Sequence, residues 1–409
     1  MSNDTQPEIR FPGFTEDWEQ RRLSDVASIV GGGTPSTSNP EYWDGDIDWY
    51  APAEIGDQIY VSKSLKTITE LGQQKSSAKI LPIGTVLFTS RAGIGNTAIL
   101  AKEGTTNQGF QSIVPHKNKL DSYFIFSRTH ELKRYGEVTG AGSTFAEVSG
   151  KQMAKMPILI PCINEQRKIG AFFEQLDTTI TLHQRKLDLL KETKKGFLQK
   201  MFPKNGAKVP EIRFPGFTED WEQRKLGEVS PLRGGFAFKS NKFVKEGIPI
   251  VRISNILSNG SVGGEFVYYT AQEKDENYLL PDKSALLAMS GATTGKVSIL
   301  NNPNNNKVYQ NQRVGYFTKT KNVDYSFIST LVRSKIFLDQ LNSVLVAGAQ
   351  PNISSKDINV FELTIPKNIE EQKKIGNFFK QLDDTIALHQ RKLDLLKETK
   401  KGFLQKMFV

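Results

Sequence analysis

Two long segments of the chain place apolar residues at alternating steps of three and four, within residues 165–202 and in a second segment near the end. The first series is Ile169, Phe173, Leu176, Ile180, His183, Leu187, Leu190, Lys194, Phe197 and Met201. The second is Ile375, Phe379, Leu382, Ile386, His389, Leu393, Leu396, Lys400, Phe403 and Met407. This spacing is typical of the buried seam of a coiled coil. The pattern therefore predicts two long helices, within residues 161–203 and 366–409.

Prolines limit the two predicted helices. Pro161 and Pro366 stand just upstream, where a helix start tolerates proline, and Pro203 ends the first helix. The two seams have equal length and phase, so we expect them to pack on each other, although each helix could instead pack only on its own domain. With a pseudo-twofold axis across the helices, the pair would be antiparallel, and His183 and His389 would meet near that axis.

An exact internal repeat frames the chain. Residues 7–21 recur at 210–224, and residues 182–202 recur at 388–408, without a single difference. Between these frames, residues 24–156 and 227–361 share only fragments: a turn beginning at Ser90 or Ser290, an Asn-Gln pair, and an Ala-Gly dipeptide. The pattern indicates a tandem duplication with a constant frame and altered contents.

The duplication predicts four parts and an α+β fold. Residues 1–160 form the first frame and variable domain, 161–203 the first helix, 204–365 the linker, repeated frame and second variable domain, and 366–409 the second helix. Each variable segment contains a Pro-Gly or Pro-Asp turn, a β-rich run and a polar glycine turn, as at residues 79–93 and 279–300. A rigid sheet would aim such loops at a ligand.

The charge of the chain favours a polyanionic partner. Its net charge is +10 and its pI is about 9.3, which suits nucleic acid first, although a soluble basic protein would look the same. Each identical helix end, 182–202 and 388–408, carries six basic residues against two acidic ones. Such a stretch is typical of a solvated face, a docking surface for a partner subunit, or a track along phosphates.

Candidate DNA-binding side chains lie in the loops of both variable segments. Hydroxyl groups suit phosphates, and arginine or amide side chains suit base edges. The candidates are Thr34, Ser36, Trp49, Tyr50, Ser90, Arg91, Asn96, Gln108, Lys239, Ser240, Arg252, Asn255, Ser290, Thr293, Thr294, Lys296, Gln312, Gln350 and Asn352. Arg91 leads this set, because a guanidinium group in such a loop can bind guanine through two hydrogen bonds.

Several other functions lack the residues they need. Cys162 is the only cysteine and the four histidines are scattered, so neither a disulfide framework nor a zinc site is expected. No Pro-Pro dipeptide occurs, which argues against an amino-methyltransferase loop, and the glycine turns at residues 93–98 and 290–297 only half-resemble nucleotide-binding motifs. We expect no catalytic residue and no bound metal. The start of the chain has no signal-peptide pattern and no run of 18 apolar residues occurs, so we expect the cytoplasm.

The assembled pattern resembles the specificity (S) subunit of type I restriction–modification systems. The resemblance spans the whole chain and rests on WEQRRLSDV and WEQRKLGEV, on GGGTPS with YWDGDIDW, on GFAFKS with GIPIVRISNI, on AGAQPNIS, and on the IP…EQ(R/K)KI(G) helix entries. The first half departs from the pattern at residues 142–150, which read GSTFAEVSG where the second half has the AGAQPNIS loop.

The resemblance implies a division of labour. Each target-recognition domain would read one half-site in the major groove of double-stranded DNA, and the helix pair would set an unread spacer between them. Two methyltransferase subunits would flip and methylate adenines at N6 with S-adenosylmethionine, and restriction subunits would use ATP with magnesium. None of these cofactors would bind this chain.

Two alternatives remain open at this point. One is a coiled-coil DNA-binding regulator, or orphan reader, without a methyltransferase partner. The other is a self-sufficient DNA-modifying enzyme, which the missing Pro-Pro loop disfavours.

Overall fold

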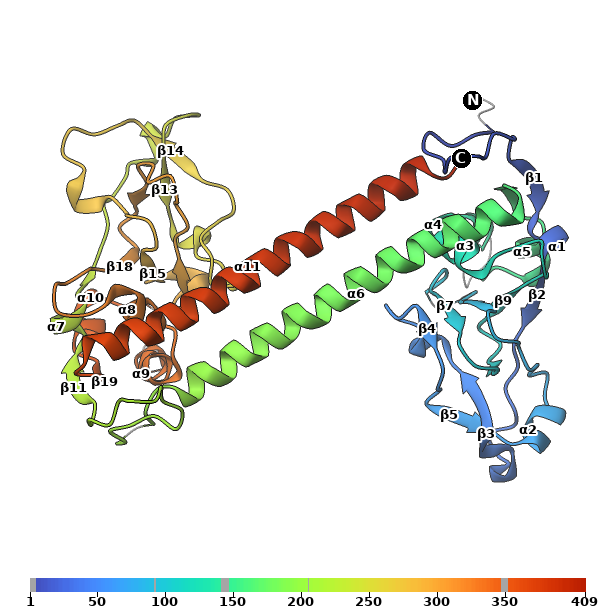
Figure 1. Cartoon of the computed structure of the whole chain (residues 1–409), viewed down its shortest axis with the longest axis horizontal. Coiled ribbons are helices and arrows are strands. Elements are labelled where there is room, and N and C mark those ends of the chain that lie inside the picture. The colour runs from blue at the N-terminus through green and yellow to red at the C-terminus, as the bar shows by residue number, and fades with distance from the viewer. Residues whose placement is uncertain (1–4, 92, 141–146, 205, 347–351) are drawn as a thin grey trace. The chain divides into compact units, whose positions relative to one another are not determined.

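The chain folds into two compact units, which are described separately below. The computed structural model describes residues 5–91, 93–140, 147–204, 206–346 and 352–409. Unit 1 comprises residues 1–184 and 392–409, and unit 2 comprises residues 185–391 (Figure 1). Each long helix is therefore shared between the units, in contrast to the linear division into domains followed by helices.

Unit 1 contains short strands and helices around the start of the first long helix. Its strands are β1 (Glu19–Arg22), β2 (Ala27–Gly31), β3 (Trp43–Tyr50), β4 (Tyr60–Val61), β5 (Lys66–Ile68), β6 (Val86–Phe88), β7 (Thr97–Leu100), β8 (Thr105–Thr106), β9 (Gln111–Pro115) and β10 (Pro157–Ile160). Its helices are α1 (Leu23–Val26), η1 (Pro40–Tyr42), η2 (Pro52–Glu54), α2 (Glu70–Gln74), α3 (Ser122–Ser127), α4 (Thr129–Gly140), α5 (Gly150–Ala154) and the first part of α6 (Ile163–Lys200).

Unit 2 repeats this order around the start of the second long helix. Its strands are β11 (Glu222–Lys225), β12 (Leu232–Arg233), β13 (Ile248–Val251), β14 (Val267–Tyr269), β15 (Ala285–Ala288), β16 (Val297–Ile299), β17 (Tyr309–Gln310), β18 (Val314–Phe317) and β19 (Glu362–Ile365). Its helices are α7 (Leu226–Val229), η3 (Ser240–Lys242), η4 (Ile253–Asn255), η5 (Glu276–Tyr278), η6 (Gly291–Thr293), α8 (Tyr325–Leu331), α9 (Lys335–Val346), α10 (Ser355–Asn359) and the first part of α11 (Ile369–Lys406).

The sheets of the two units share one topology. The order β2-β9-β6-β7-β4 in unit 1 corresponds to β12-β18-β15-β16 in unit 2, with β4 as an added edge strand. In the smaller sheets, β3 pairs antiparallel with β5 and parallel with β8, and β13 pairs antiparallel with β14 and parallel with β17. The prediction that one fold is used twice is confirmed, even where the two sequences share few residues.

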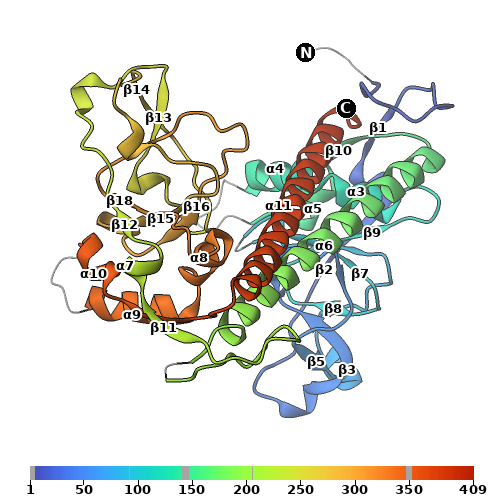
Figure 2. The ribbon, with the colours of Figure 1, turned by 60° about the vertical axis from the view of Figure 1, so that its left-hand side comes forward.

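The layers inside each unit also correspond. In both ribbon views, the larger sheet of unit 1 lies between the first part of α6 and the β5-β3-β8 sheet, and the larger sheet of unit 2 lies between α8 with α11 and the β14-β13-β17 sheet (Figures 1 and 2). The inner strands β6 and β15 of the larger sheets read as short apolar runs that are buried throughout. Burial on both faces is typical of strands with such continuous apolar sequences.

The two long helices have the predicted seam. Phe173, Leu187, Phe379 and Leu393 are at most 1% exposed, whereas the outward residues Leu189 and Leu395 are 60% and 68% exposed. The remaining members of the apolar seam are at least partly buried. Among the described residues, no helix is both long enough and apolar enough to span a bilayer.

Within each unit the two helices run antiparallel. In unit 1, Phe172 contacts Phe403 with ring centroids 5.0 Å apart, and Phe173 stacks on Phe408 at 5.7 Å. In unit 2, Phe197 contacts Phe378 at 5.0 Å. Because earlier residues of one helix meet later residues of the other, the antiparallel prediction is confirmed inside each unit. His183 belongs to unit 1 and His389 to unit 2, so their meeting stays a prediction.

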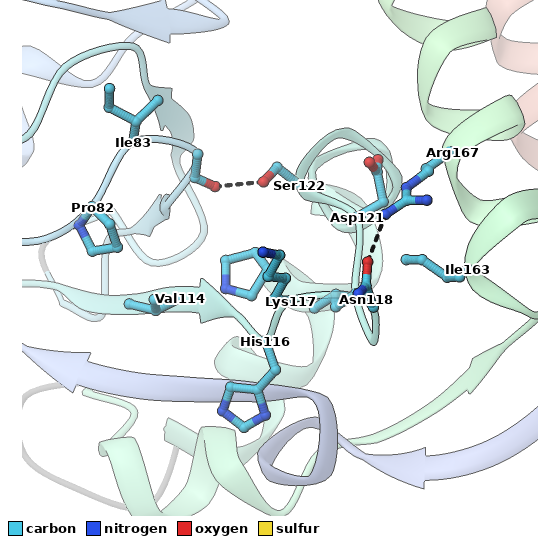
Figure 3. A pocket seen from close by; sticks show the side chains of 13 residues that line it. Pro82, Ile83, Val114, His116, Lys117, Asn118, Asp121, Ser122, Ile163 and Arg167 are labelled. Carbon is cyan, nitrogen blue, oxygen red and sulfur yellow. Dashed lines mark hydrogen bonds between the residues drawn. The ribbon is translucent and has the colours of Figure 1, made fainter.

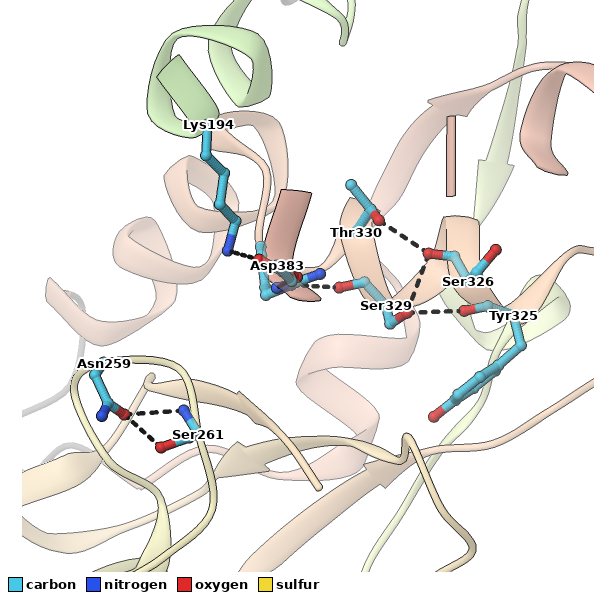
Figure 4. A network of polar contacts seen from close by, with 9 residues as sticks. Lys194, Asn259, Ser261, Tyr325, Ser326, Ser329, Thr330 and Asp383 are labelled. Atoms are coloured by element: carbon cyan, nitrogen blue, oxygen red, sulfur yellow. Dashed lines mark hydrogen bonds and ion pairs between the residues drawn. The ribbon is translucent and has the colours of Figure 1, made fainter. Parts of the chain in front are cut away.

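The seam lysines pair with aspartates of the opposite helix. Lys400 Nζ lies 2.5 Å from Asp177 Oδ1 in unit 1, and Lys194 Nζ lies 2.6 Å from Asp383 Oδ1 in unit 2, where the two side chains point toward each other (Figure 4). These charges interrupt an otherwise apolar seam, and a polar residue at such a position favours one helix register over others. The heptad pattern predicted the positions of the lysines but not their partners.

Asp383 and Asp177 have different third partners. Arg333 donates to Asp383 Oδ2 at 2.7 Å, whereas Tyr123 Oη donates to Asp177 Oδ2 at 2.9 Å. Burial by itself raises the pKa of Asp383, but Arg333 and Lys194 outweigh burial and hold that pKa below its usual value. Burial, reinforced by repulsion from Arg333, lowers the pKa of Lys194.

The exact repeat at residues 7–21 and 210–224 anchors each helix entry. Arg10 makes two hydrogen bonds to Glu165 at 2.7 and 2.8 Å, and Arg213 makes the same two to Glu371. Both glutamates are almost fully buried. The hydrogen bond to each glutamate raises the pKa of its arginine. A buried ion pair with two parallel hydrogen bonds fixes the direction in which the helix leaves the frame.

Candidate nucleic-acid interface

The candidate side chains of unit 1 gather at one edge of its larger sheet. β2 and β6 both run antiparallel to β9, so the ends of β2 and β6 meet the start of β9 at the same edge. Thr34 follows β2, Arg91 and Asn96 lie between β6 and β7, and Gln108 precedes β9. We call this edge, with its equivalent in unit 2, the recognition edge.

The recognition edge of unit 2 is built from the corresponding loops. Lys239 and Ser240 follow β12, residues 290–296 join β15 to β16, and Gln312 precedes β18. The end of β13, with Arg252 directly after it, lies beside this edge because Asn311 N donates to Val251 O at 3.0 Å. Unit 1 has the same bond from Asn107 N to Tyr50 O at 3.0 Å. The structure thus confirms that the two Asn-Gln pairs are equivalent.

The two serine turns are equivalent only after a shift of one residue. Ser90 N donates to Gly109 O at 2.8 Å, and Met289 N donates to Arg313 O at 3.0 Å. Ser90 O accepts from Val148 N, and Met289 O accepts from Ile353 N. Ser90 therefore corresponds to Met289 and Arg91 to Ser290. The expected match of Ser90 with Ser290 was wrong because hydrogen-bond register, and not the shared serine, sets the alignment.

Four of the candidate side chains are buried inside the protein. Trp49 Nε1 donates to Gly33 O at 2.8 Å, and Asn255 Nδ2 donates to Gly263 O and Glu265 O at 2.9 Å each. Tyr50 is 1% exposed and Ser90 is 0% exposed. Burial raises the pKa of Tyr50 well above its usual value. Side chains without solvent access cannot touch a DNA groove in this conformation, so these four residues leave the candidate set.

The remaining candidates of unit 1 are accessible at the edge. Thr34 Oγ1 donates to Gln108 Oε1, which joins the loop after β2 to the turn before β9. Arg91 forms a loose ion pair with Glu147, with Nη1 3.8 Å from Oε2 and both side chains more than a third exposed. Asn96 Nδ2 donates to Ile55 O at 3.3 Å, and Ser36 Oγ lies 2.8 Å from Ser38 Oγ.

Some candidates of unit 2 are exposed at the surface, and others make hydrogen bonds that hold a turn. Lys239, Ser240, Gln312 and Asn352 are exposed, while Ser290 and Arg252 are partly buried. Three residues hold the β15–β16 turn: Thr293 Oγ1 donates to Ile253 O, Thr294 Oγ1 to Gly291 O, and Lys296 Nζ to Ser258 Oγ. Gln350 lies outside the described residues.

Two accessible residues at the edge of unit 2 escaped the sequence prediction. Arg313 is exposed directly beside Gln312. Phe236 is 45% exposed and stacks on Tyr278 at 4.8 Å. Arg313 had a usable signal, since a basic residue follows the repeated Asn-Gln pair only in the second half. Phe236 had none, because phenylalanine in a loop is usually read as core.

A pocket of about 240 Å³ lies at the opposite edge of the larger sheet of unit 1 (Figure 3). Several of its polar side chains already have partners: Arg167 Nη2 donates to Asn118 Oδ1 at 2.9 Å, and His116 Nε2 lies 2.9 Å from Ser28 Oγ. Burial raises the pKa of Asp121 in its wall. We assign this pocket no ligand.

Comparison with known proteins gives a consistent result. Residues 15–192 and 218–398 match the family model described as "Type I restriction modification DNA specificity domain". The chain is 26% identical over 413 residues to the Type I restriction enzyme MjaIX specificity subunit of Methanocaldococcus jannaschii, with 96% of this chain and 93% of that protein covered. It is 31% identical over 168 residues to the EcoR124I/EcoR124II specificity subunit of Escherichia coli, covering 39% and 41%.

A solved structure agrees in fold. The crystal structure of the S subunit of a type I restriction–modification system from M. genitalium aligns with a TM-score of 0.66 at 13% identity, covering 99% of both chains. Each family match takes in one frame, one variable segment and most of one long helix. The chain therefore belongs to the family of type I restriction–modification DNA specificity subunits.

Proposed function

We propose that the two units read two different half-sites of one DNA target and that each unit reads through its recognition edge. This proposal rests on one observation: the two units place different residues at equivalent positions of their turns. The backbone hydrogen bonds that flank these turns are the same in both units, but unit 1 places Arg91 and Gly109 where unit 2 places Ser290 and Arg313. Different donor patterns on one scaffold are what two different base sequences require.

In this proposal the chain supplies recognition and its partner subunits supply the chemistry. Two methyltransferase subunits flip and methylate one adenine in each half-site with S-adenosylmethionine, and restriction subunits add ATP-dependent cleavage with magnesium. The accessible candidates at the edges are amides, hydroxyls and cations, a set that suits binding to phosphates and base edges.

The identical helix ends support a symmetric pair of partners. Residues 182–202 and 388–408 have the same sequence and carry the same outward leucines, of which Leu189 is 60% and Leu395 is 68% exposed. Solvation alone does not require outward residues to be identical, whereas one kind of partner bound twice does. We therefore assign these outward faces to two copies of the methyltransferase subunit.

The helices also suit the role of a spacer in this proposal. Inserting seven residues into both helices preserves the seam phase, because seven residues restore the heptad. We expect the modified target to keep both half-sites and to gain unread base pairs between them. Sequencing of methylated adenines measures the spacer directly, and an unchanged spacer would show that the helices do not set it.

The deciding experiment maps methylated adenines in a host with and without this chain. We expect a two-part motif that disappears when the chain is removed. Incubation of the purified chain with DNA and labelled methyl donor, with and without methyltransferase subunits, tests the division of labour. Transfer by the chain alone would overturn the non-catalytic assignment, and a single undivided motif would overturn two-unit reading.

A further inference from the structure

The turn before β18 presents Arg313 on a firmly held backbone. Val314 N donates to Asn311 O at 3.0 Å, and Arg313 N donates to Asn311 Oδ1 at 3.4 Å. Arg313 O accepts from Met289 N at 3.0 Å. These bonds tie the turn to the end of β15, so the position of the arginine backbone is set before any ligand arrives.

The guanidinium group of Arg313 is available for a ligand. Within the described parts of the chain it makes no hydrogen bond or ion pair, and the side chain is exposed. Two other arginines of unit 2 are bound to carboxylates: Arg213 binds Glu371, and Arg224 binds Glu222 and Glu228 at 3.1 Å each. A cation left without a carboxylate beside the recognition edge fits an anionic or acceptor-rich partner.

Unit 1 has little room for a side chain at the equivalent position. There the residue is Gly109, and a Cβ atom would lie 2.8 Å from Pro52 Cγ and 3.0 Å from Asn107 Oδ1. Its edge carries Arg91 instead, in the loop after the neighbouring strand β6, where unit 2 has Ser290. Each unit therefore presents one arginine among these paired positions, from the loop after β6 in unit 1 and from the turn before β18 in unit 2.

We propose that Arg313 is a specificity-determining residue that reads a guanine in the half-site of unit 2, as Arg91 does in unit 1. This inference rests on the proposed function and extends it to a named base contact. Arginine binds the N7 and O6 acceptors of guanine through two hydrogen bonds, which no other base offers in that pattern in the major groove. Because the two arginines lie in different loops of equivalent edges, their guanines occupy different places within the two half-sites.

The test uses the full chain assembled with its methyltransferase subunits, after the wild-type motif has been mapped. Arg313→Ala and Arg313→Lys are compared on targets with each base at every position. We expect Arg313→Ala to lose roughly tenfold or more in discrimination at one guanine of the unit 2 half-site, and Arg313→Lys to lose less because lysine also donates to guanine. The unit 1 half-site should remain unchanged. Replacing that guanine with 7-deazaguanine should weaken wild-type binding by a similar factor and leave Arg313→Ala unaffected.

Arg224→Ala is the matched control, since it removes an exposed arginine of unit 2 away from the edge. It should leave both half-sites unchanged. A uniform loss of binding for all targets in Arg313→Ala, with discrimination between bases intact, would identify a phosphate contact and overturn the inference. So would a unit 2 half-site without guanine. Failure of the wild-type complex to yield a two-part motif would instead reject the proposed function itself.

Discussion

The two frames of this chain have stayed alike, whereas its two recognition edges have diverged. The helix entry keeps the same buried ion pair in both units, Arg10 with Glu165 and Arg213 with Glu371, at matching distances. At the edges, the equivalent turn holds Gly109 in one unit and Arg313 in the other. The difference separates two requirements, since one helix geometry must be produced twice while two base patterns must be distinguished.

Even the constant frame is not perfectly equivalent in its contacts. Trp221 Nε1 donates to Glu371 Oε1 at 3.2 Å, whereas Trp18 Nε1 is buried and makes no hydrogen bond to a described residue. Both tryptophans occupy the same place in identical fifteen-residue repeats. The surroundings contributed by each unit therefore alter a contact that the repeat itself does not change.

The largest effect is expected from breaking the frame ion pairs. Glu371→Gln leaves Arg213 largely buried without a carboxylate, which should lower the free energy of unfolding of unit 2 by about 3 kcal/mol. Glu165→Gln should cost unit 1 a similar amount, slightly less because Trp18 makes no bond there. Urea unfolding of the full chain measures both. The exposed neighbour Glu370→Gln is the control, and an equally small effect of all three changes would show that the frame does not anchor the helices.

A smaller, asymmetric effect is expected at the seam aspartates. Asp383→Asn leaves two cations, Lys194 and Arg333, facing each other and should cost about 2 kcal/mol. Asp177→Asn leaves only Lys400 and retains an acceptor for Tyr123, so about 1 kcal/mol is expected. Equal losses of unfolding free energy would mean that the third partners, Arg333 and Tyr123, do not matter. The two units would then not differ at this position.

The pH dependence of the stability that Asp383 contributes follows from the direction in which its pKa is shifted. The folded-state pKa of Asp383 lies below its usual value, so its stabilising contribution is complete above the ordinary aspartate pKa of about 4. That contribution is lost as pH falls through the lowered pKa. The difference in unfolding free energy between wild type and Asp383→Asn should therefore shrink on acidification, and a constant difference down to pH about 2 would contradict the assignment.

The smallest effect on stability, but the most selective effect on recognition, is expected at the edge of unit 1. Arg91→Ala removes one base contact, so about 1–3 kcal/mol of discrimination should disappear at a single position of one half-site. Methylation of a library of randomised targets measures this loss of discrimination. Stability should hardly change, because Arg91 forms only a loose surface pair with Glu147. Equal relaxation of both half-sites would contradict independent reading by the units.

The sequence was most informative where periodicity and exact repetition constrain structure. The seam of Phe173, Leu187, Phe379 and Leu393 followed from the heptad alone, since burial along a helix depends on spacing. The topology of the variable segments did not follow, because their strands are only two to eight residues long and pair across long sequence separations.

The candidate site was predicted only in outline. The predicted loops lie together at the recognition edges, but Trp49, Tyr50, Ser90 and Asn255 are buried, and the exposed Arg313 was not among the candidates. Sequence composition shows which side chains can bind DNA, whereas burial depends on the neighbouring strands that cover them. The one-residue shift between Ser90 and Ser290 arose in the same way, from hydrogen bonds that a sequence comparison does not contain.

The composition of unit 1 has a consequence for the order in which the molecule is completed during synthesis. Phe408 packs against Trp18, Phe124 and Phe173, and Ile9 N donates to Lys406 O at 2.9 Å. Residues 1–184 are synthesised roughly 200 residues before residues 392–409, an interval that at about 5–20 residues per second lasts at least ten seconds. Unit 2 consists of continuous chain and can close earlier. The nascent chain therefore carries an uncovered aromatic surface until residues 392–409 arrive, and transiently exposed apolar surface of this kind is what chaperones protect.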